Sequence, residues 1–232
     1  MTRFLERLFA WIGGALFVTS LALTGWSYAL WFRQPAPWAG WRPIVFNAAL
    51  LSVFAVHHSL FARRWMKTLL SSVCPEQLLR SVYVWVASLL LILVCLLWRS
   101  IGGDLYEAPR RWIAVVHAIA QLTGVWLIAR SVRAIDVLEL AGIRPTRSVS
   151  GGDTLQVSGP YRLVRHPLYL GWILIVFGAA HLTGDRLAFA VLTTLYLVVA
   201  IPWEERALEH TFGAAYARYR QRVRWRVVPY VY

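Results

Sequence analysis

The feature that most constrains this chain is a series of long apolar stretches that carry almost no charge. A transmembrane helix needs about 20 mostly apolar residues. Six stretches come close to this length: Leu8–Phe32, Pro43–Ala62, Ser81–Trp98, Trp112–Ala129, Leu168–Gly184 and Leu187–Trp203. Only 15% of the 232 residues are charged, against roughly a quarter in a soluble domain. We therefore expect an all-α integral membrane protein with about six transmembrane helices.

The apolar stretches divide the chain into two regions of different character. The first stretch is too long for a signal-peptide core and has no small-residue cleavage site behind it, so we expect it to be retained as a span. Residues 1–129 would hold four spans with short links. Residues 130–232 would hold a polar loop, two short spans separated only by Gly184-Asp185-Arg186, and a basic tail. This spacing predicts a tight C-terminal helical hairpin.

The distribution of Lys and Arg predicts the orientation in the membrane. With the N-terminus inside, 18 of the 24 basic residues fall on the inner segments and 6 on the outer ones. Cytoplasmic loops carry an excess of Lys and Arg. We therefore expect a protein of the inner (cytoplasmic) membrane with both termini in the cytoplasm.

The net charge of +13 bears on the partners of the chain. In a soluble protein this charge would suggest nucleic acid. Here the arginines lie between apolar stretches and in the tail, from Arg218 to Arg226. Anionic lipid headgroups are therefore the expected partner, and no nucleic acid is expected. Cys74 and Cys95 show no disulfide framework or metal-ligand spacing, and no metal is expected.

Polar residues with chemical potential converge at the predicted hairpin. Pro167 suits the first turn of a helix, where its missing N–H costs nothing. Arg165 and His166 would therefore stand at the mouth of the fifth span, where the helix N-terminus favours negative charge. The sixth span returns to the same side and ends at Glu204-Glu205. Carboxylates at a membrane boundary are costly unless paired or hydrated, so they suggest a functional site.

A purely structural role could also explain each of these residues. The two glutamates would be explained by an ion pair with Arg165 or Arg206 at the end of a span. His166 would be explained by contact with phosphates. His57 and His58 are adjacent and point to different faces of a helix, which makes them a poor metal pair. They either pack and supply interfacial polarity, or one of them lines the acceptor site.

The same residues carry a family resemblance. The motifs are Gly-Pro-Tyr-Arg-Leu-Val-Arg-His-Pro-Leu-Tyr-Leu-Gly over residues 159–171, Glu-Glu-Arg-Ala-Leu over 204–208, and then Phe212-Gly213, Tyr216, Tyr219 and Pro229. Over about residues 150–230 the chain resembles the isoprenylcysteine carboxyl methyltransferase family. The resemblance implies that S-adenosyl-L-methionine binds in a pocket formed by the last two spans, the loop before them and the tail.

The N-terminal half resembles one branch of that family. The motifs His58-Ser59-Leu60-Phe61-Ala62-Arg63, residues 80–84 and residues 136–144 are similar to those of the bacterial methanethiol S-methyltransferase and NnrU-like branch. By position, the resemblance implies that the cofactor is bound by Thr154, Leu155, Gln156, Tyr161, His166, Pro167, Leu168, Tyr169 and Glu204. The candidate catalytic residues are Glu204, Arg165 and His58.

Two departures from the family bear on the acceptor. The prenylcysteine enzymes have a histidine where this chain has Asp153. They also have an arginine, assigned to the substrate carboxylate, where this chain has Ala200. The loss of that arginine favours a small thiol such as methanethiol. A thiol must lose a proton, which His58 or a carboxylate could accept.

Three alternatives to this function remain open at the level of sequence. The enzyme could methylate a prenyl-cysteine carboxylate or a lipid headgroup. It could be a reductase of the sterol reductase type, although such proteins usually have ten spans. It could also be an NnrU-like accessory protein without catalysis. The sequence does not indicate the oligomeric state.

Overall fold

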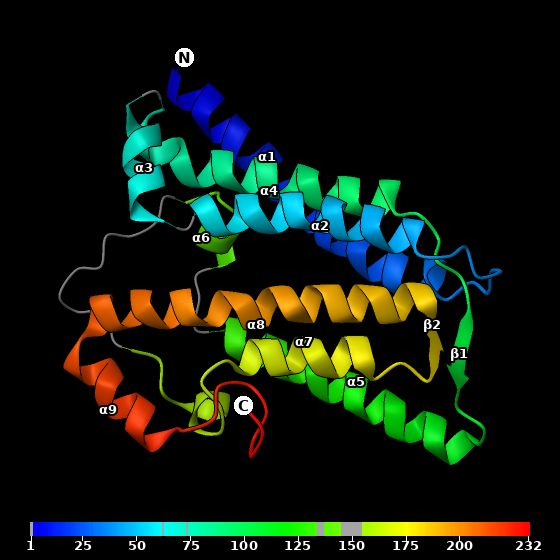
Figure 1. Cartoon of the computed structure of the whole chain (residues 1–232). Coiled ribbons are helices and arrows are strands. Elements are labelled where there is room, and N and C mark those ends of the chain that lie inside the picture. Colours follow the sequence, from blue (N-terminus) through cyan, green and yellow to red (C-terminus); the bar gives the residue numbers. More distant parts are fainter. Residues whose placement is uncertain (1, 62, 73, 134–136, 145–154) are drawn as a thin grey trace. The chain divides into compact units, whose positions relative to one another are not determined.

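The computed structural model describes residues 2–61, 63–72, 74–133, 137–144 and 155–232 (Figure 1). Its elements in chain order are α1 (Thr2–Trp26), the π-helical turn η1 (Ser27–Trp31), α2 (Arg42–Phe61), α3 (Arg64–Ser71), α4 (Glu76–Leu97), β1 (Asp104–Glu107), α5 (Arg111–Val132), α6 (Val137–Leu140), the 3-10 turn η2 (Gly159–Arg162), α7 (Pro167–Phe177), β2 (His181–Thr183), α8 (Gly184–Phe212) and α9 (Ala214–Arg222). Strands β1 and β2 form a two-stranded sheet.

The helices confirm an integral membrane protein of the all-α class. Within the described ranges, five helices are long and apolar enough to cross a membrane: Arg3–Trp31, Arg42–Phe61, Glu76–Leu97, Arg111–Val132 and Gly184–Phe212. Each of them overlaps one of the stretches predicted from the sequence. Their side chains carry many exposed large apolar groups, as surfaces in contact with lipid require.

The predicted count of six spans is not confirmed, because the stretch Leu168–Gly184 does not form one long helix. Helix α7 has 11 residues and ends at Phe177. At a rise of about 1.5 Å per residue it is roughly 17 Å long, well short of the ~30 Å hydrocarbon core. The chain then leaves the helix at Gly178 and enters strand β2. Apolar character alone does not reveal this break.

The break before α8 also lies elsewhere than predicted. Gly184-Asp185-Arg186 is not the loop of a hairpin but the first turn of α8. At its other end α8 does not stop near Glu204, because the helix continues through Pro202 to Phe212. Its 29 residues correspond to roughly 43 Å, more than the hydrocarbon core needs. The two glutamates therefore lie within a helix rather than at its end.

The described residues form two compact units, each of which has its own packing. The first contains residues 2–104, residues 137–144 and the start of α8, and the second contains most of the remaining chain. The predicted division at residue 129 remains a prediction. In the first unit α1 lies beside α4 (Figure 1). Phe9 stacks on Trp85 at 5.3 Å, and the indole N–H of Trp85 donates to the Phe9 carbonyl.

The start of α8 is fixed within the first unit by a buried carboxylate. Asp185 is 3% exposed and accepts four hydrogen bonds. Their donors are the Trp98 indole (2.8 Å), the Ser100 hydroxyl (3.1 Å), and the backbone N–H groups of Ile101 (2.9 Å) and Gly102 (3.0 Å). A buried charge is tolerated when its oxygens are satisfied in this way. This explains why Asp185 belongs to a packed helix start and not to an exposed loop.

The second unit is built on close contact between α5 and α7. A Cβ atom on Gly171 would lie 2.7 Å from the Gly124 carbonyl oxygen, and one on Gly124 would lie 2.5 Å from that of Gly171. Paired small residues allow two helix backbones to approach in this way inside a membrane. Helix α8 is tied to α7 by the Trp172 indole, which donates to the Thr193 hydroxyl at 3.0 Å. These contacts hold α7 in register for the site at its N-terminus.

Candidate active site

The site is built around the first turn of α7, where the predicted helix start is confirmed. His166 is the N-cap and Pro167 is the first helical residue. The backbone N–H groups of Arg165 and His166 donate to the carbonyls of Trp225 (2.9 Å) and Arg226 (2.8 Å). The C-terminal tail is therefore bonded directly to the segment that enters α7.

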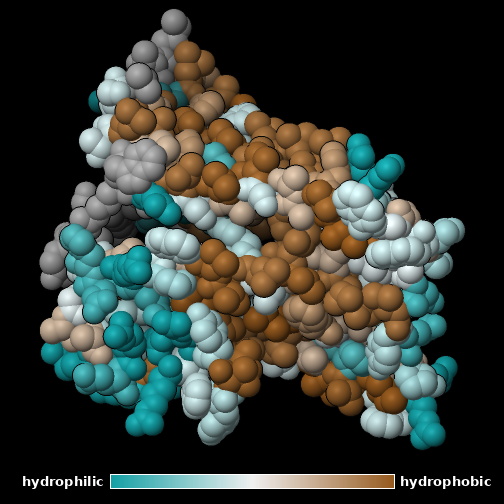
Figure 2. All heavy atoms as spheres, in the orientation of Figure 1, coloured by the Kyte–Doolittle hydropathy of each residue, from teal (hydrophilic) through white to brown (hydrophobic). Residues whose placement is uncertain are grey.

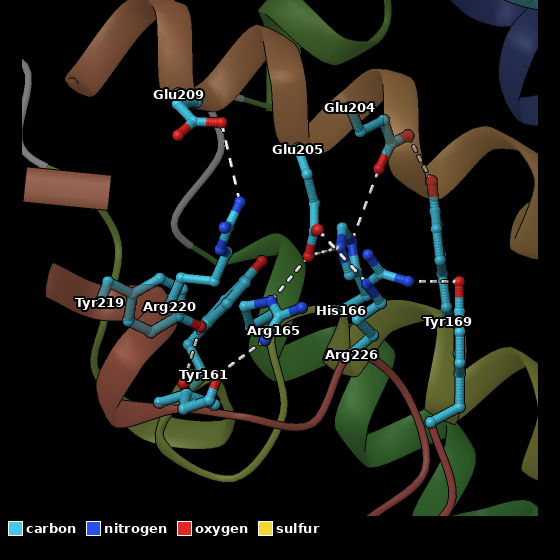
Figure 3. Close-up of polar contacts among 12 residues, drawn as sticks. Tyr161, Arg165, His166, Tyr169, Glu204, Glu205, Glu209, Tyr219, Arg220 and Arg226 are labelled. Atoms are coloured by element: carbon cyan, nitrogen blue, oxygen red, sulfur yellow. Dashed lines mark hydrogen bonds and ion pairs between the residues drawn. The ribbon is translucent and has the colours of Figure 1, made fainter. Parts of the chain in front are cut away.

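Arg165 is buried, and its described contacts are internal to the second unit. Its Nε donates to Glu205 at 2.6 Å, and its Nη1 donates to the carbonyls of Val223 (2.8 Å) and Arg224 (2.7 Å). Its side chain is only 6% exposed. The guanidinium thus joins α8 to the tail (Figure 3). These contacts favour a positioning role for Arg165 over direct contact with a substrate.

Glu205 is the central acceptor of this network. Besides Arg165, it lies 3.3 Å from Arg226 Nε and 3.5 Å from His166 Nε2. The side chain of Glu205 is 6% exposed. The structural alternative considered from the sequence, an ion pair with Arg165, therefore holds for this glutamate.

Glu204 has a different environment from its neighbour. Successive residues of a helix point about 100° apart, so Glu204 faces Tyr169 while Glu205 faces Arg165 (Figure 3). The Tyr169 hydroxyl donates to Glu204 Oε1, and His166 Nδ1 lies 3.6 Å from Oε2. The side chain of Glu204 remains 47% exposed. The buried ion pair with Arg165 accounts for Glu205 but does not involve Glu204, and the carboxylate of Glu204 is accessible.

His166 lies between the two glutamates and stacks on Tyr169. The two rings are 5.3 Å apart and nearly parallel, at 14°. His166 is 8% exposed, so it has little surface for contact with lipid phosphates. Its position instead orders the Tyr169 hydroxyl toward Glu204.

Tyr161 is held by two residues from other elements. The Tyr219 hydroxyl donates to the Tyr161 carbonyl at 2.8 Å. Burial raises the pKa of the Tyr161 phenol, and a hydrogen bond with Ser131 partly offsets this rise. Ser131 is fully buried on α5. Ser131 is not recognisable as a site residue from sequence, because one serine near the end of an apolar stretch is a weak signal.

Helix α9 covers this region with its tyrosines. Tyr216 and Tyr219 are buried with Val223, and the cluster packs against Leu155, Tyr161, Leu208 and Phe212. Burial, together with the nearby Glu205 carboxylate, raises the pKa of Tyr216 to about 12. Burial also raises the pKa of Tyr219. Gly213, with a φ of +50°, ends α8 and turns the chain into α9.

The tail contributes one residue to the site that its sequence pattern does not reveal. Arg226 was expected among the arginines that meet lipid headgroups, but it pairs with Glu205 and also donates to the Tyr232 hydroxyl at 2.9 Å. The five tail arginines alternate regularly along the sequence, so their pattern does not distinguish this one from the others.

The remaining predicted cofactor residues occupy less distinctive positions. Leu155 packs against the α9 tyrosines, and Leu168 is partly buried in the first turn of α7. The Gln156 side chain is exposed and donates to the Ser158 hydroxyl at 3.1 Å. Thr154 lies outside the described residues, as does Asp153.

His58 belongs to the first unit. Its Nδ1 lies 2.7 Å from the Tyr83 hydroxyl, and the Arg80 guanidinium lies over the Tyr83 ring at 5.2 Å. His57 packs against Phe61 at 4.3 Å. Its ring nitrogens have no hydrogen-bond partner among the described residues. The alternative that a histidine here serves only in packing therefore fits His57 better than it fits His58.

Comparison with known proteins places the chain in a family. Residues 112–215 match the phospholipid methyltransferase family. Methanethiol S-methyltransferase 2 of Bradyrhizobium diazoefficiens is 36% identical over 191 residues, which cover 78% of this chain and 71% of that protein. The chain belongs to the phospholipid methyltransferase family. Methanethiol S-methyltransferase 1 of the same bacterium is 35% identical over 185 residues, covering 78% of this chain.

The family also contains relatives with other names. Nurim of Sus scrofa is 28% identical over 182 residues, covering 72% of this chain and 69% of that protein. The chain covers 65% of Methanethiol S-methyltransferase 1, slightly less than two thirds of its length. No solved structure matches the chain.

Proposed function

We propose that this chain transfers a methyl group from S-adenosyl-L-methionine to methanethiol and releases dimethyl sulfide. The observation that carries the proposal is the accessible Glu204 carboxylate beside a buried ion-pair network, in a chain whose similar relatives are named methanethiol S-methyltransferases. The proposed location is the inner membrane with both termini in the cytoplasm.

The residues present fit the proposed cofactor. S-adenosyl-L-methionine carries hydroxyl and ammonium donors, and Glu204 offers them a half-exposed carboxylate oriented by Tyr169 and His166. Tyr161, His166, Pro167, Leu168, Tyr169 and Glu204 would hold it, with Leu155 and Gln156 from the preceding segment and Thr154 before them. When bound, it supplies an electrophilic methyl group on a sulfonium that carries its own leaving group.

The contribution of the chain would be mainly one of positioning. Correct orientation of two reactants can contribute ~7–11 kcal/mol to lowering a barrier. The network of Arg165, Glu205 and Arg226 serves this by fixing α8, the entry to α7 and the tail to one another. Exclusion of water by the α9 tyrosines would increase the reactivity of a thiolate.

The proposed proton acceptor for the thiol is His58. A base must be neutral and oriented, and the Tyr83 hydroxyl fixes the orientation of the His58 ring. The thiol proton would pass to the His58 ring, while the thiolate sulfur forms the new bond to carbon. Replacement by glutamine would keep the polarity at this position and remove the basic nitrogen.

The acceptor is proposed to be a small neutral thiol and not a carboxylate. Ala200 lies one helical turn before Glu204 on α8, where it offers no positive charge. Carboxyl methylation of a prenyl-cysteine and methylation of a lipid headgroup remain as alternatives. A non-catalytic role remains the second class of function, since the family also includes proteins whose names state no activity.

The test is a methylation assay on detergent-solubilised full-length protein. The cofactor carries an isotopically labelled methyl group, and the acceptors are methanethiol, a prenyl-cysteine analogue and phosphatidylethanolamine. We expect labelled dimethyl sulfide in the headspace, a loss of more than tenfold in Glu204→Gln, and little change in Glu209→Gln. Glu209 is a matched control because it is a half-exposed glutamate on the same helix. Absence of cofactor binding, or equal activity of Glu204→Gln and wild type, would refute the proposal.

A further inference from the structure

The outer face of α9 and the tail carries a concentration of positive charge that the methyl transfer does not use. Residues 214–232 contain five arginines and no acidic residue. Arg220 pairs with Glu209, and Arg226 pairs with Glu205. Within the described part of the chain, Arg218, Arg222 and Arg224 pair with no acidic side chain, and all three are exposed. Figure 2 shows hydrophilic residues gathered over α9 and the C-terminal end of α8.

The two faces of α9 have separate roles. Tyr216 and Tyr219 point inward and are buried with Val223. Arg218 and Arg222 lie one helical turn apart, and like charges at this spacing repel one another. An anion placed between them would remove this repulsion. The geometry thus favours a ligand with negative charge on the outer face.

Exposed aromatic and apolar groups accompany these arginines. Tyr230 is 87% exposed and packs against Trp225 at 5.3 Å, and Val231 is 77% exposed. Trp and Tyr are enriched at the boundary between a membrane and water, because one end of the side chain is apolar and the other is polar. Guanidinium groups next to exposed aromatic rings match the composition of that boundary.

Chain connectivity brings this surface close to lipid. Helix α9 follows directly after α8, which is long and apolar enough to cross a membrane. Because α8 is longer than the hydrocarbon core, its last turns and α9 would emerge at the level of the headgroups. A nucleic acid would require the same charges but would not require this proximity.

We propose that Arg218, Arg222 and Arg224, with the Trp225–Tyr230 pair, form a surface that binds the anionic phospholipid headgroups of the membrane in which the protein lies. The proposal rests on the exposed charges and rings of this tail surface, and it does not depend on the methyl transfer proposed above.

The test compares lipid selection by three full-length proteins reconstituted in phosphatidylcholine membranes. Spin-labelled phosphatidylglycerol and spin-labelled phosphatidylcholine report the relative association of each lipid with the protein. We expect wild type to prefer phosphatidylglycerol by at least roughly fivefold, the factor that corresponds to about 1 kcal/mol for a single basic residue near an anionic surface. We expect Arg218→Gln/Arg222→Gln to lose most of this preference.

The matched control is Arg110→Gln/Arg111→Gln, which removes the same charge from two exposed arginines elsewhere. Their segment also contains Asp104 and Glu107, so its local charge is balanced and we expect the preference to remain. If both variants lose it equally, net charge alone explains the selection and the proposal fails. If the tail variant loses affinity for a labelled RNA but keeps its lipid preference, the surface serves an acidic macromolecule and the proposal also fails.

Two measurements keep the test decisive if the glutamine variant does not fold. The wild-type preference must fall when NaCl is raised from about 0.05 to about 0.5 M, because salt screens exposed charges. Arg218→Lys/Arg222→Lys must keep most of the preference. A preference that is absent from wild type, or insensitive to salt, would overturn the proposal.

Discussion

Replacement of Glu205 by glutamine would test whether the buried network holds the site together. The substitution keeps the size of the side chain but removes its charge, and it leaves Arg165 buried at 6% exposure without its partner at 2.6 Å. Removal of one member of a buried ion pair costs about 3–5 kcal/mol. Glutamine still offers one carbonyl oxygen to Arg165 Nε, so we expect the lower end, about 3 kcal/mol. For 150–250 residues this corresponds to a fall in melting temperature of roughly 6–12 °C.

The assay is thermal unfolding of the purified protein in detergent, followed by near-ultraviolet circular dichroism and by trypsin cleavage in the tail. Glu209→Gln is the matched control, because both members of the Glu209–Arg220 pair are 50% exposed. Exposed pairs contribute about 0–1 kcal/mol, so this control should melt within roughly 4 °C of wild type. Because Arg165 also binds the carbonyls of Val223 and Arg224, Glu205→Gln should be cleaved faster after the tail arginines. If the two variants melt together and are cleaved at the same rate, Glu205 does not organise the site.

Two further predictions concern packing and pH. Gly171→Ala should lower the melting temperature by several degrees, because its Cβ would lie 2.7 Å from the Gly124 carbonyl and overpacking costs about 1–3 kcal/mol. Gly25→Ala is the control and should not lower the melting temperature, because nothing lies within 4 Å of a Cβ at that position. Equal melting temperatures of the two variants would show that α5 and α7 do not need this close approach. The pKa of Tyr216 is raised from 10.0 to about 12, so the unfolded chain loses this proton first. The stability from the neutral phenol is then present below pH ~10 and lost as pH rises toward ~12. Melting temperatures across this range should fall less steeply in Tyr216→Phe, and an unchanged slope would contradict the assignment.

Several features of the site were predictable from local sequence. Pro167 predicts the helix start because a proline at the first helical position loses no hydrogen bond. The motifs around Tyr161, His166 and Glu204 predict residues that the structure brings together on the second unit. The spacing of three residues between Tyr216 and Tyr219 predicts a shared helix face, and both side chains are buried on it.

Other features depend on contacts between residues far apart in the chain. The family motif singles out Glu204 for the cofactor, but only the packing of α8 against α7 and the tail buries Glu205 and exposes Glu204. Arg226 is one of five alternating arginines until the tail folds back to bond with Arg165 and His166.

The long apolar stretches by themselves determined that this protein lies in a membrane, because a soluble fold of 232 residues cannot bury so many long charge-free stretches away from water. They did not determine how many stretches cross it. Helix α7 stops after 11 residues, and α8 extends past the predicted end of its span. Hydropathy measures the transfer of side chains into lipid, whereas the ends of these helices depend on backbone hydrogen bonds and on specific contacts, such as those of Asp185, that only the folded chain provides.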